Sequence, residues 1–133
     1  MKTPINKETC LREFHQEFGL PAWFTPRVPP SDRRKLRVDL INEEAKEFQE
    51  SSEAGDLVNA AKELADILYV VYGAAVEWGI PLDAVFEKVH RSNMGKVWPD
   101  GKVHYNEAGK VLKPPTYTPP DIASVLREWE AGI

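Results

Sequence analysis

The chain has 133 residues, and its 17 basic and 21 acidic side chains give a net charge of −4 at pH 7. That length is typical of one domain, and the negative charge argues against a protein that coats nucleic acid. A single cysteine, Cys10, excludes an internal disulfide and a multi-cysteine zinc site. Because the sequence has neither a long apolar run nor a secretory signal, we expect a cytoplasmic protein without a membrane span.

Prolines mark the organisation of the chain. Of the eleven prolines, five lie in residues 1–30, five lie in residues 99–120, and only Pro81 falls between these segments. Because proline interrupts helices, the middle of the chain is free to be helical and the flanks are not. We therefore expect one all-α domain over residues 1–133, with its main helices in 31–95 and a proline-rich hairpin or loop in 99–120.

Apolar spacing and capping residues predict five helices. Ser31 and Asp56 are candidate N-caps, and Gly79 is a candidate helix end. The predicted helices cover residues 5–18, 31–50, 57–78 and 82–94, and a last short helix runs from the Thr118–Asp121 stretch to about residue 131. Between the last two helices, residues 103–105 and 110–112 flank a turn and predict a small hairpin.

Three glutamates lie on the apolar side of the helix predicted over residues 31–50. Glu43, Glu44 and Glu47 spell E-E-x-x-E. At ~100° per residue they share an arc with Leu36 and Leu40, while the opposite arc is entirely polar. The glutamates therefore continue the apolar stripe instead of opposing it.

The next helix carries a second acidic pair on an apolar background. Asp66 is the only charge in residues 64–76, which is typical of a helix buried in a bundle or at a subunit interface. Glu63 and Asp66 are i,i+3 neighbours on one face. Close, buried carboxylates repel one another, and a divalent cation relieves that repulsion. Five carboxylates without histidine or thiol indicate a hard metal, Mg²⁺ or Mn²⁺.

These motifs resemble the metal signature of the all-α NTP pyrophosphohydrolases, the superfamily that includes MazG, the dimeric dUTPases and phosphoribosyl-ATP pyrophosphohydrolase. The shared pattern is E-E-x-x-E, fifteen intervening residues, and E-x-x-D. The likeness continues through residues 63–75, 79–96 and 100–122. The last two stretches are similar to the phosphoribosyl-ATP pyrophosphohydrolase-like, MazG-like subgroup of bacteria and phages.

The resemblance implies hydrolysis of a (deoxy)nucleoside triphosphate to the monophosphate and pyrophosphate, with Mg²⁺ as cofactor and Mn²⁺ as its substitute. It implies a four-helix-bundle MazG-like fold, with catalytic helices in residues 31–95, completed in a homodimer or homotetramer in the cytoplasm, the host's if phage-encoded. The base preference it favours is dGTP or GTP, with dUTP or dCTP as the alternative. It assigns the metal to Glu43, Glu44, Glu47, Glu63 and Asp66, and either Glu43 or Glu44 is the candidate general base.

Several polar and aromatic residues are candidate substrate contacts. The resemblance places the S-N-M-G-K stretch beside the triphosphate, which points to Asn93 and Lys96. Lys110 and Lys113 on the predicted hairpin are in a position to close over phosphates. A further group of aromatic residues in proline-flanked stretches is suited to stacking on a base, although each is more often a packing residue: Trp23, Trp98 and Tyr117.

Three alternatives stay open at this point. Glu44 has a possible partner in Lys62, which would make it part of an ordinary ion pair. The chain is also compatible with a non-catalytic helical interaction protein that binds metal structurally. Glu87 and His90 spell the E-x-x-H element of di-iron bundles, but the required second copy is absent. Arg91 is the expected partner of Glu87, four residues earlier.

Overall fold

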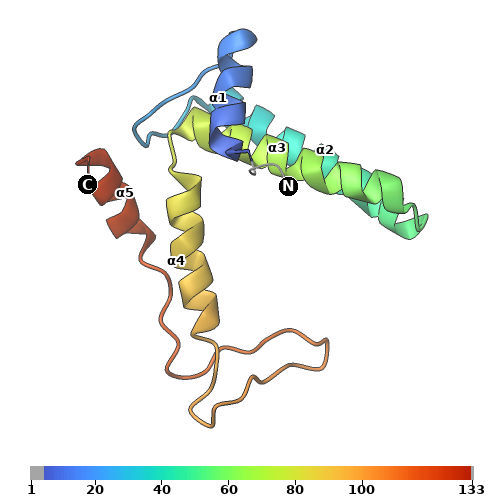
Figure 1. Cartoon of the computed structure of the whole chain (residues 1–133), viewed down its shortest axis with the longest axis vertical. Helices are drawn as coiled ribbons and strands as arrows, with labels where there is room; N and C mark the ends of the chain where they lie inside the picture. Colours follow the sequence, from blue (N-terminus) through green and yellow to red (C-terminus); the bar gives the residue numbers. More distant parts are fainter. Residues whose placement is uncertain (1–4, 133) are drawn as a thin grey trace. The chain divides into compact units, whose positions relative to one another are not determined.

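The computed structural model describes residues 5–132, and its regular structure is helical (Figure 1). The helices are α1 (Lys7–Glu17), α2 (Ser31–Glu53), α3 (Leu57–Trp78), α4 (Leu82–Met94) and α5 (Ile122–Glu130). The predicted all-α class is confirmed. The described residues divide into two compact units, one ending at Pro81 and one beginning at Leu82. Each unit is described by itself below.

The first unit is built on α2 and α3, which lie side by side and are joined by a tight turn (Figure 1). The bounds of α3 agree with the prediction. Asp56 caps its N-terminus by accepting a hydrogen bond from the Asn59 N–H at 3.1 Å. Gly79 ends it with φ = 67°, in the left-handed region that glycine adopts without strain.

Two predicted ends of the first unit's helices are wrong. Ser31 is the first helical residue, not the N-cap; Pro30 occupies the cap position, and no side chain caps this end. The helix α2 also continues past Glu50 to Glu53, because the serines that follow Glu50 are accommodated in its last turn. It ends only where Gly55 takes a positive φ of 64°. Helix α1 begins after Asn6, whose side chain accepts from the Thr9 N–H.

The segment between α1 and α2 runs along the C-terminal end of α3. The Trp23 N–H donates to the Val76 carbonyl at 3.0 Å, and the Arg27 N–H donates to the Trp78 carbonyl at 2.9 Å. Beneath this segment lies the apolar core of the unit, formed by Leu11, Ala75 and Val76. The core is small, and polar contacts add to it by joining α2 to α3 and α1 to α2.

A buried ionic network joins the three helices of this unit. Glu77 is 1% exposed, and its carboxylate accepts from Arg33 Nε and from Arg37 Nε, both at 2.6 Å. Burial alone would raise the pKa of Glu77, but the hydrogen bonds from Arg33 and Arg37 outweigh it and leave that pKa below its usual value. His15 lies 3.4 Å from Arg37 and 2.7 Å from the Pro21 carbonyl, and burial lowers its pKa.

The second unit contains α4, α5 and the connection between them. The two helices pack on each other, and Val125 is buried. The predicted hairpin is reduced to one antiparallel bridge between Tyr105 and Val111. Its turn is held by the Asn106 side chain, which accepts from the backbone N–H groups of Ala108 and Lys110. Among the described residues, no single helix is both long and apolar enough to cross a membrane; α3 and α4 reach that composition only when taken together across their break.

Candidate active site

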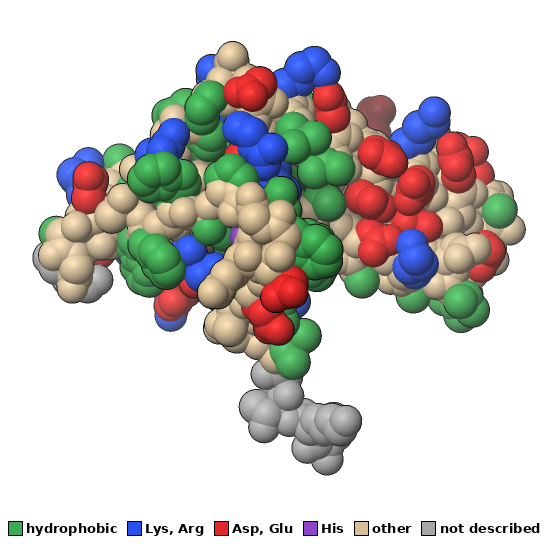
Figure 2. All heavy atoms as spheres, turned by 90° about the horizontal axis from the view of Figure 1, so that it is seen from above, with side chains coloured by type: hydrophobic (Ala, Val, Ile, Leu, Met, Phe, Trp, Pro, Cys, Tyr) green, Lys and Arg blue, Asp and Glu red, His purple; other side chains and the backbone are tan. Residues whose placement is uncertain are grey.

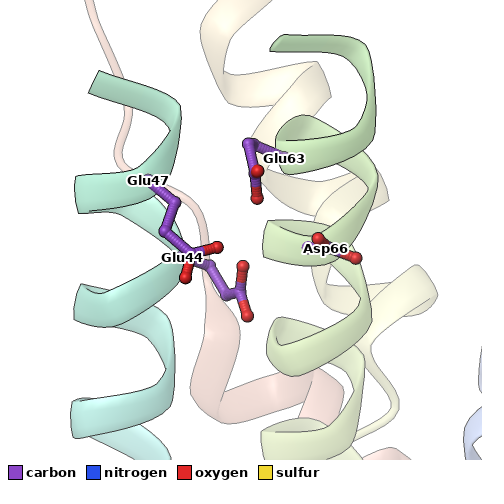
Figure 3. Close-up of side chains that lie close together, drawn as sticks. All are labelled: Glu44, Glu47, Glu63 and Asp66. Atoms are coloured by element: carbon purple, nitrogen blue, oxygen red, sulfur yellow. The ribbon is translucent and has the colours of Figure 1, made fainter. Parts of the chain in front are cut away.

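Four carboxylates converge between α2 and α3. Glu44 and Glu47 come from α2, and Glu63 and Asp66 come from α3. One oxygen of each side chain lies within 4.8 Å of an oxygen of every other. Figure 3 shows the side chains pointing toward one another across the space between the two helices. In the space-filling view, acidic side chains gather at the right-hand end, over α2 and α3 (Figure 2).

Helical spacing and pairing explain this convergence. Each helix supplies an i,i+3 pair, which lies on one face, and the two faces meet because α2 and α3 pack side by side. Glu43, the fifth predicted ligand, is exposed and does not belong to the group. It precedes Glu44 and lies ~100° from it around the helix axis, which turns it away from α3.

We call Glu44, Glu47, Glu63 and Asp66 the acid cluster. The surroundings of two of its carboxylates disfavour their negative charge. Glu44 Oε2 and Glu63 Oε2 are buried without a hydrogen-bond partner. Burial, and then the neighbouring charge of Glu47, raises the pKa of Glu44. Burial, and then a hydrogen bond with Glu47, raises the pKa of Glu63. Carboxylates in this state need a counter-charge.

Lys62 supplies only part of that counter-charge. Its ammonium lies 2.7 Å from Asp66 Oδ2 and 3.9 Å from Glu63 Oε2. It therefore pairs with Asp66 and not with Glu44, which was the alternative that the sequence left open. The Lys62 side chain is 64% exposed, so one solvated ammonium stands beside four carboxylates.

The cluster has the composition of a site for a hard metal ion. All four donors are carboxylate oxygens, and two of these side chains carry a buried oxygen with no hydrogen-bond partner in the described structure. Divalent cations such as Mg²⁺ prefer oxygen donors of this kind. The residues therefore fit a metal ion that would be held by the acid cluster.

The first unit contains a cavity of about 320 Å³ whose lining begins one helical turn from the acid cluster. Leu40 lies one turn from Glu44 on α2, and Val70 lies one turn from Asp66 on α3; both line the cavity. Other lining residues are apolar or aromatic, and the buried network contributes polar groups: Leu11, Phe14, Leu20, Leu36, Tyr69, His15, Arg33 and Arg37. The sequence analysis did not identify this cavity, because α1 closes it from a distant part of the chain.

The four predicted substrate contacts lie in the second unit, whereas the acid cluster lies in the first. Asn93 is exposed near the end of α4, and Lys110 is exposed on the connection that follows. The Lys96 and Lys113 ammonium groups lie 5.9 and 5.1 Å from the centre of the Tyr117 ring. The contact of these residues with substrate stays a prediction.

The aromatic candidates for base stacking have protein partners. The Arg27 guanidinium lies 4.0 Å from the Trp23 ring centre, and Trp98 stacks on His104 at 4.4 Å. These contacts of Trp23 and Trp98 are those of packing residues. The predicted ion pair between Arg91 and Glu87 is also present, at 2.8 Å.

A comparison with protein families decides the classification. The profile described as phosphoribosyl-ATP pyrophosphohydrolase matches residues 11–93. The chain belongs to this family. The matched segment includes α2, α3 and the whole acid cluster.

Two individual proteins extend this relationship. An uncharacterised protein of Acanthamoeba polyphaga mimivirus is 39% identical over 78 residues, which is 56% of this chain and 31% of the viral protein. The chain thus spans about a third of that relative's length. A crystal structure from Exiguobacterium sp. 255-15, named as a candidate NTP pyrophosphohydrolase, is 28% identical with a TM-score of 0.52. That match covers 99% of this chain and 100% of the other.

Proposed function

We propose that this protein hydrolyses a (deoxy)nucleoside triphosphate to the monophosphate and pyrophosphate in a reaction that depends on Mg²⁺, with Mn²⁺ as a substitute. The observation that carries the proposal is the acid cluster, in which four carboxylates meet and two of them bury an oxygen that has no hydrogen-bond partner in the described structure. Its position inside the segment that matches a pyrophosphohydrolase family supports the reaction class. The proposed place of action is the cytoplasm.

The metal ligands in this proposal are Glu44, Glu47, Glu63 and Asp66. Bound Mg²⁺ would supply a more acidic water and neutralise charge on the phosphoryl oxygens. The four carboxylates would hold the ion in place, because two of them lie on the face of α2 that meets α3 and two lie on the face of α3 that meets α2. Glu43 was implied as a fifth ligand by the resemblance, but its exposed side chain gives that role no support.

We assign the general base to Glu44. One oxygen of its carboxylate is buried without a hydrogen-bond partner in the described structure, which suits a group that takes a proton from the attacking water. If water attacks the α-phosphorus, pyrophosphate leaves with the bridging oxygen and the water oxygen enters the monophosphate. If water attacks the β-phosphorus, the monophosphate leaves with the bridging oxygen and the water oxygen enters pyrophosphate.

The nucleoside end of the substrate is proposed to occupy the cavity next to the acid cluster. Phe14 and Tyr69 offer aromatic surface there, and Leu40 connects the cavity to Glu44. The proposed base preference is dGTP or GTP, with dUTP or dCTP as the alternative. This preference rests on the family resemblance, and the cavity supports only the presence of a base.

We also propose that the protein is a homodimer or homotetramer whose interface includes the outer face of α3. Leu64 is 50% exposed and Leu68 is 47% exposed on this helix. An apolar face of that kind on a small domain is typical of an oligomer interface. Packing two α2–α3 pairs together would complete the four-helix bundle that the resemblance implies.

The proposed reaction is tested with a panel of all ribo- and deoxynucleoside triphosphates, dUTP included, in Mg²⁺ or Mn²⁺. Products are separated by ion-exchange chromatography. Monophosphate plus pyrophosphate, lost on chelation with EDTA, is the expected result, and the rates rank the bases. Orthophosphate as the product, or activity that persists in EDTA, contradicts the proposal. Mg²⁺ binding without cleavage of any triphosphate favours phosphoribosyl-ATP or a modified nucleotide as the substrate, or the non-catalytic alternative.

A further inference from the structure

One ammonium group lies against the acid cluster. Lys62 Nζ is 2.7 Å from Asp66 Oδ2 and 3.9 Å from Glu63 Oε2. Among the described residues, Lys62 is the only one whose ammonium or guanidinium forms an ion pair with the cluster. Lys62 and Asp66 are i,i+4 neighbours on α3, so their contact forms along one helix. Lys62 therefore reaches two of the four proposed metal ligands from the helix that carries them.

This single ammonium does not balance the charge of the cluster. Four carboxylates converge within 4.8 Å, and Glu44 Oε2 and Glu63 Oε2 are buried without a hydrogen-bond partner in the described structure. The Lys62 side chain is 64% exposed, so water screens much of its attraction for the carboxylates. A divalent cation would bring twice the charge and bond directly to several of these oxygens. The carboxylates thus favour a divalent cation over the ammonium.

Lys62 and a metal ion in the acid cluster would compete for the same carboxylate. The acceptor of the Lys62 hydrogen bond, Asp66 Oδ2, belongs to a proposed metal ligand. An ion held by the cluster would lie close to the ammonium, and two positive charges at short range repel each other. The ion would therefore bind more weakly than it would if Lys62 carried no charge.

We propose that Lys62 is a counter-cation built into the metal site, which competes with Mg²⁺ for Asp66 and lowers the affinity of the acid cluster for the ion. The inference rests on the proposed function, because it concerns the metal site of that reaction. It gives Lys62 a regulatory effect, since a lower affinity raises the Mg²⁺ concentration at which the site fills. A lysine that only stabilised α3 would leave the Mg²⁺ affinity unchanged when it was replaced.

The test measures Mg²⁺ binding to the full chain by isothermal titration calorimetry with MgCl₂, in ~0.15 M salt at constant pH and without nucleotide. We expect Lys62→Gln to bind Mg²⁺ at least about threefold more tightly than the unmodified protein, because it removes the competing charge. Lys62→Arg keeps the charge, so its affinity is expected to stay closer to that of the unmodified protein.

Lys35 offers a matched control on α2. Its ammonium pairs with Asp39 at 2.6 Å, also at i,i+4 and exposed. Lys35 lies ~13 Å before Glu44 along the helix axis, which exceeds the ~8 Å screening length in the same salt. Lys35→Gln removes the same charge and the same kind of ion pair, and we expect it to leave the Mg²⁺ affinity unchanged. Glu47→Gln removes a ligand and is expected to weaken binding, which would locate the titrated ion in the acid cluster.

Thermal unfolding followed by circular dichroism gives a second readout. In EDTA, Lys62→Gln is expected to lower the melting temperature, because the carboxylates lose their nearest positive charge. Added Mg²⁺ is expected to raise the melting temperature of Lys62→Gln by more than that of the unmodified protein, since a tighter ligand stabilises the folded state more. In Lys35→Gln, the rise caused by Mg²⁺ is expected to match that of the unmodified protein.

Three results would overturn the inference: Mg²⁺ binding that is unchanged or weaker in Lys62→Gln, an equal gain in Lys35→Gln, or no Mg²⁺ binding by any of these proteins. The triphosphate panel tests the reaction separately. If Lys62→Gln binds Mg²⁺ more tightly but no triphosphate is cleaved, the proposed reaction fails and the role of Lys62 stands. If triphosphates are cleaved but Lys62→Gln gains no affinity for Mg²⁺, the reaction stands and the role of Lys62 fails.

Discussion

At the residue scale, the environments of adjacent glutamates differ sharply. Glu44 lies in the acid cluster with a buried, unpartnered oxygen, and Glu43 lies on the exposed side of the same helix. The ~100° step between neighbouring helical residues accounts for the difference. The two adjacent glutamates of the E-E-x-x-E motif therefore differ in burial and in their distance from the other acids.

This difference predicts unequal effects of two matched substitutions. Glu44→Gln is expected to lower kcat for triphosphate hydrolysis by about 100-fold or more, because it removes the proposed base. Glu43→Gln is expected to change kcat by less than about threefold, the size of an exposed surface charge effect. Steady-state kinetics in Mg²⁺ measure both. A loss in Glu43→Gln as large as in Glu44→Gln contradicts the assignment.

The buried network predicts sensitivity to acid. The pKa of His15 is lowered by burial, so its neutral form is favoured in the folded state and its contribution to stability is lost as pH falls below 6.5. The pKa of Glu77 lies below 4.5, so its contribution is lost at still lower pH. The raised pKa values of Glu44 and Glu63 act in the opposite direction, because protonation relieves their repulsion.

A comparison of variants isolates the histidine. The melting temperature of the unmodified protein, minus that of His15→Asn, is expected to shrink as pH falls from about 7 to about 5. Differential scanning calorimetry in EDTA measures both proteins at each pH. A difference that stays constant over this interval would mean that the pKa of His15 is the same in the folded and unfolded states, which contradicts the lowering by burial.

At the element scale, α3 is the best defined helix, because its sequence specifies both ends. Asp56 caps the start, and Gly79 allows the chain to turn back at the end. The Gly79 position is also crowded: a Cβ there would lie 2.2 Å from the Thr25 carbonyl oxygen, whereas a Cβ at Gly55, which ends α2, would meet nothing within 4 Å. The two glycines thus share a positive φ and differ in their surroundings.

That contrast predicts two different costs of adding a methyl group. Gly55→Ala is expected to lower the free energy of unfolding by about 1 kcal/mol, the cost of a positive φ in a residue with a Cβ. Gly79→Ala is expected to cost about 3 kcal/mol, because the segment that carries Thr25 must also move. Urea unfolding followed by circular dichroism measures both. Equal losses of unfolding free energy in the two variants would mean that the segment carrying Thr25 moves aside at no energetic cost.

At the scale of the whole molecule, the single chain leaves much of its apolar surface uncovered. The fully buried apolar side chains of the first unit are Leu11, Ala75 and Val76, whereas Leu64 and Leu68 on α3 remain about half exposed. A chain of 15.1 kDa has a large surface for its volume, and self-association would cover such apolar side chains. The proposed oligomer follows from this imbalance.

Size-exclusion chromatography with light scattering tests the oligomer. We expect a dimer or tetramer of the 15.1 kDa chain at about 50 μM, and a monomer when Leu64→Glu and Leu68→Glu are combined, because two charges would be buried in the interface. Val103→Glu places a charge on the second unit and is the control for added charge. A monomeric unmodified protein, or an oligomer that survives the α3 substitutions, contradicts the proposal.

The amino-acid sequence by itself determined the helical class, the bounds of α3 and α4, and the acid pairs that share a face, because these features depend on local periodicity and capping. Only the tertiary structure decided which acids meet, and it left Glu43 outside. The cavity beside them and the Arg33–Glu77–Arg37 network join residues far apart in sequence. Such contacts have no local period, so the packing of the folded chain alone specifies them.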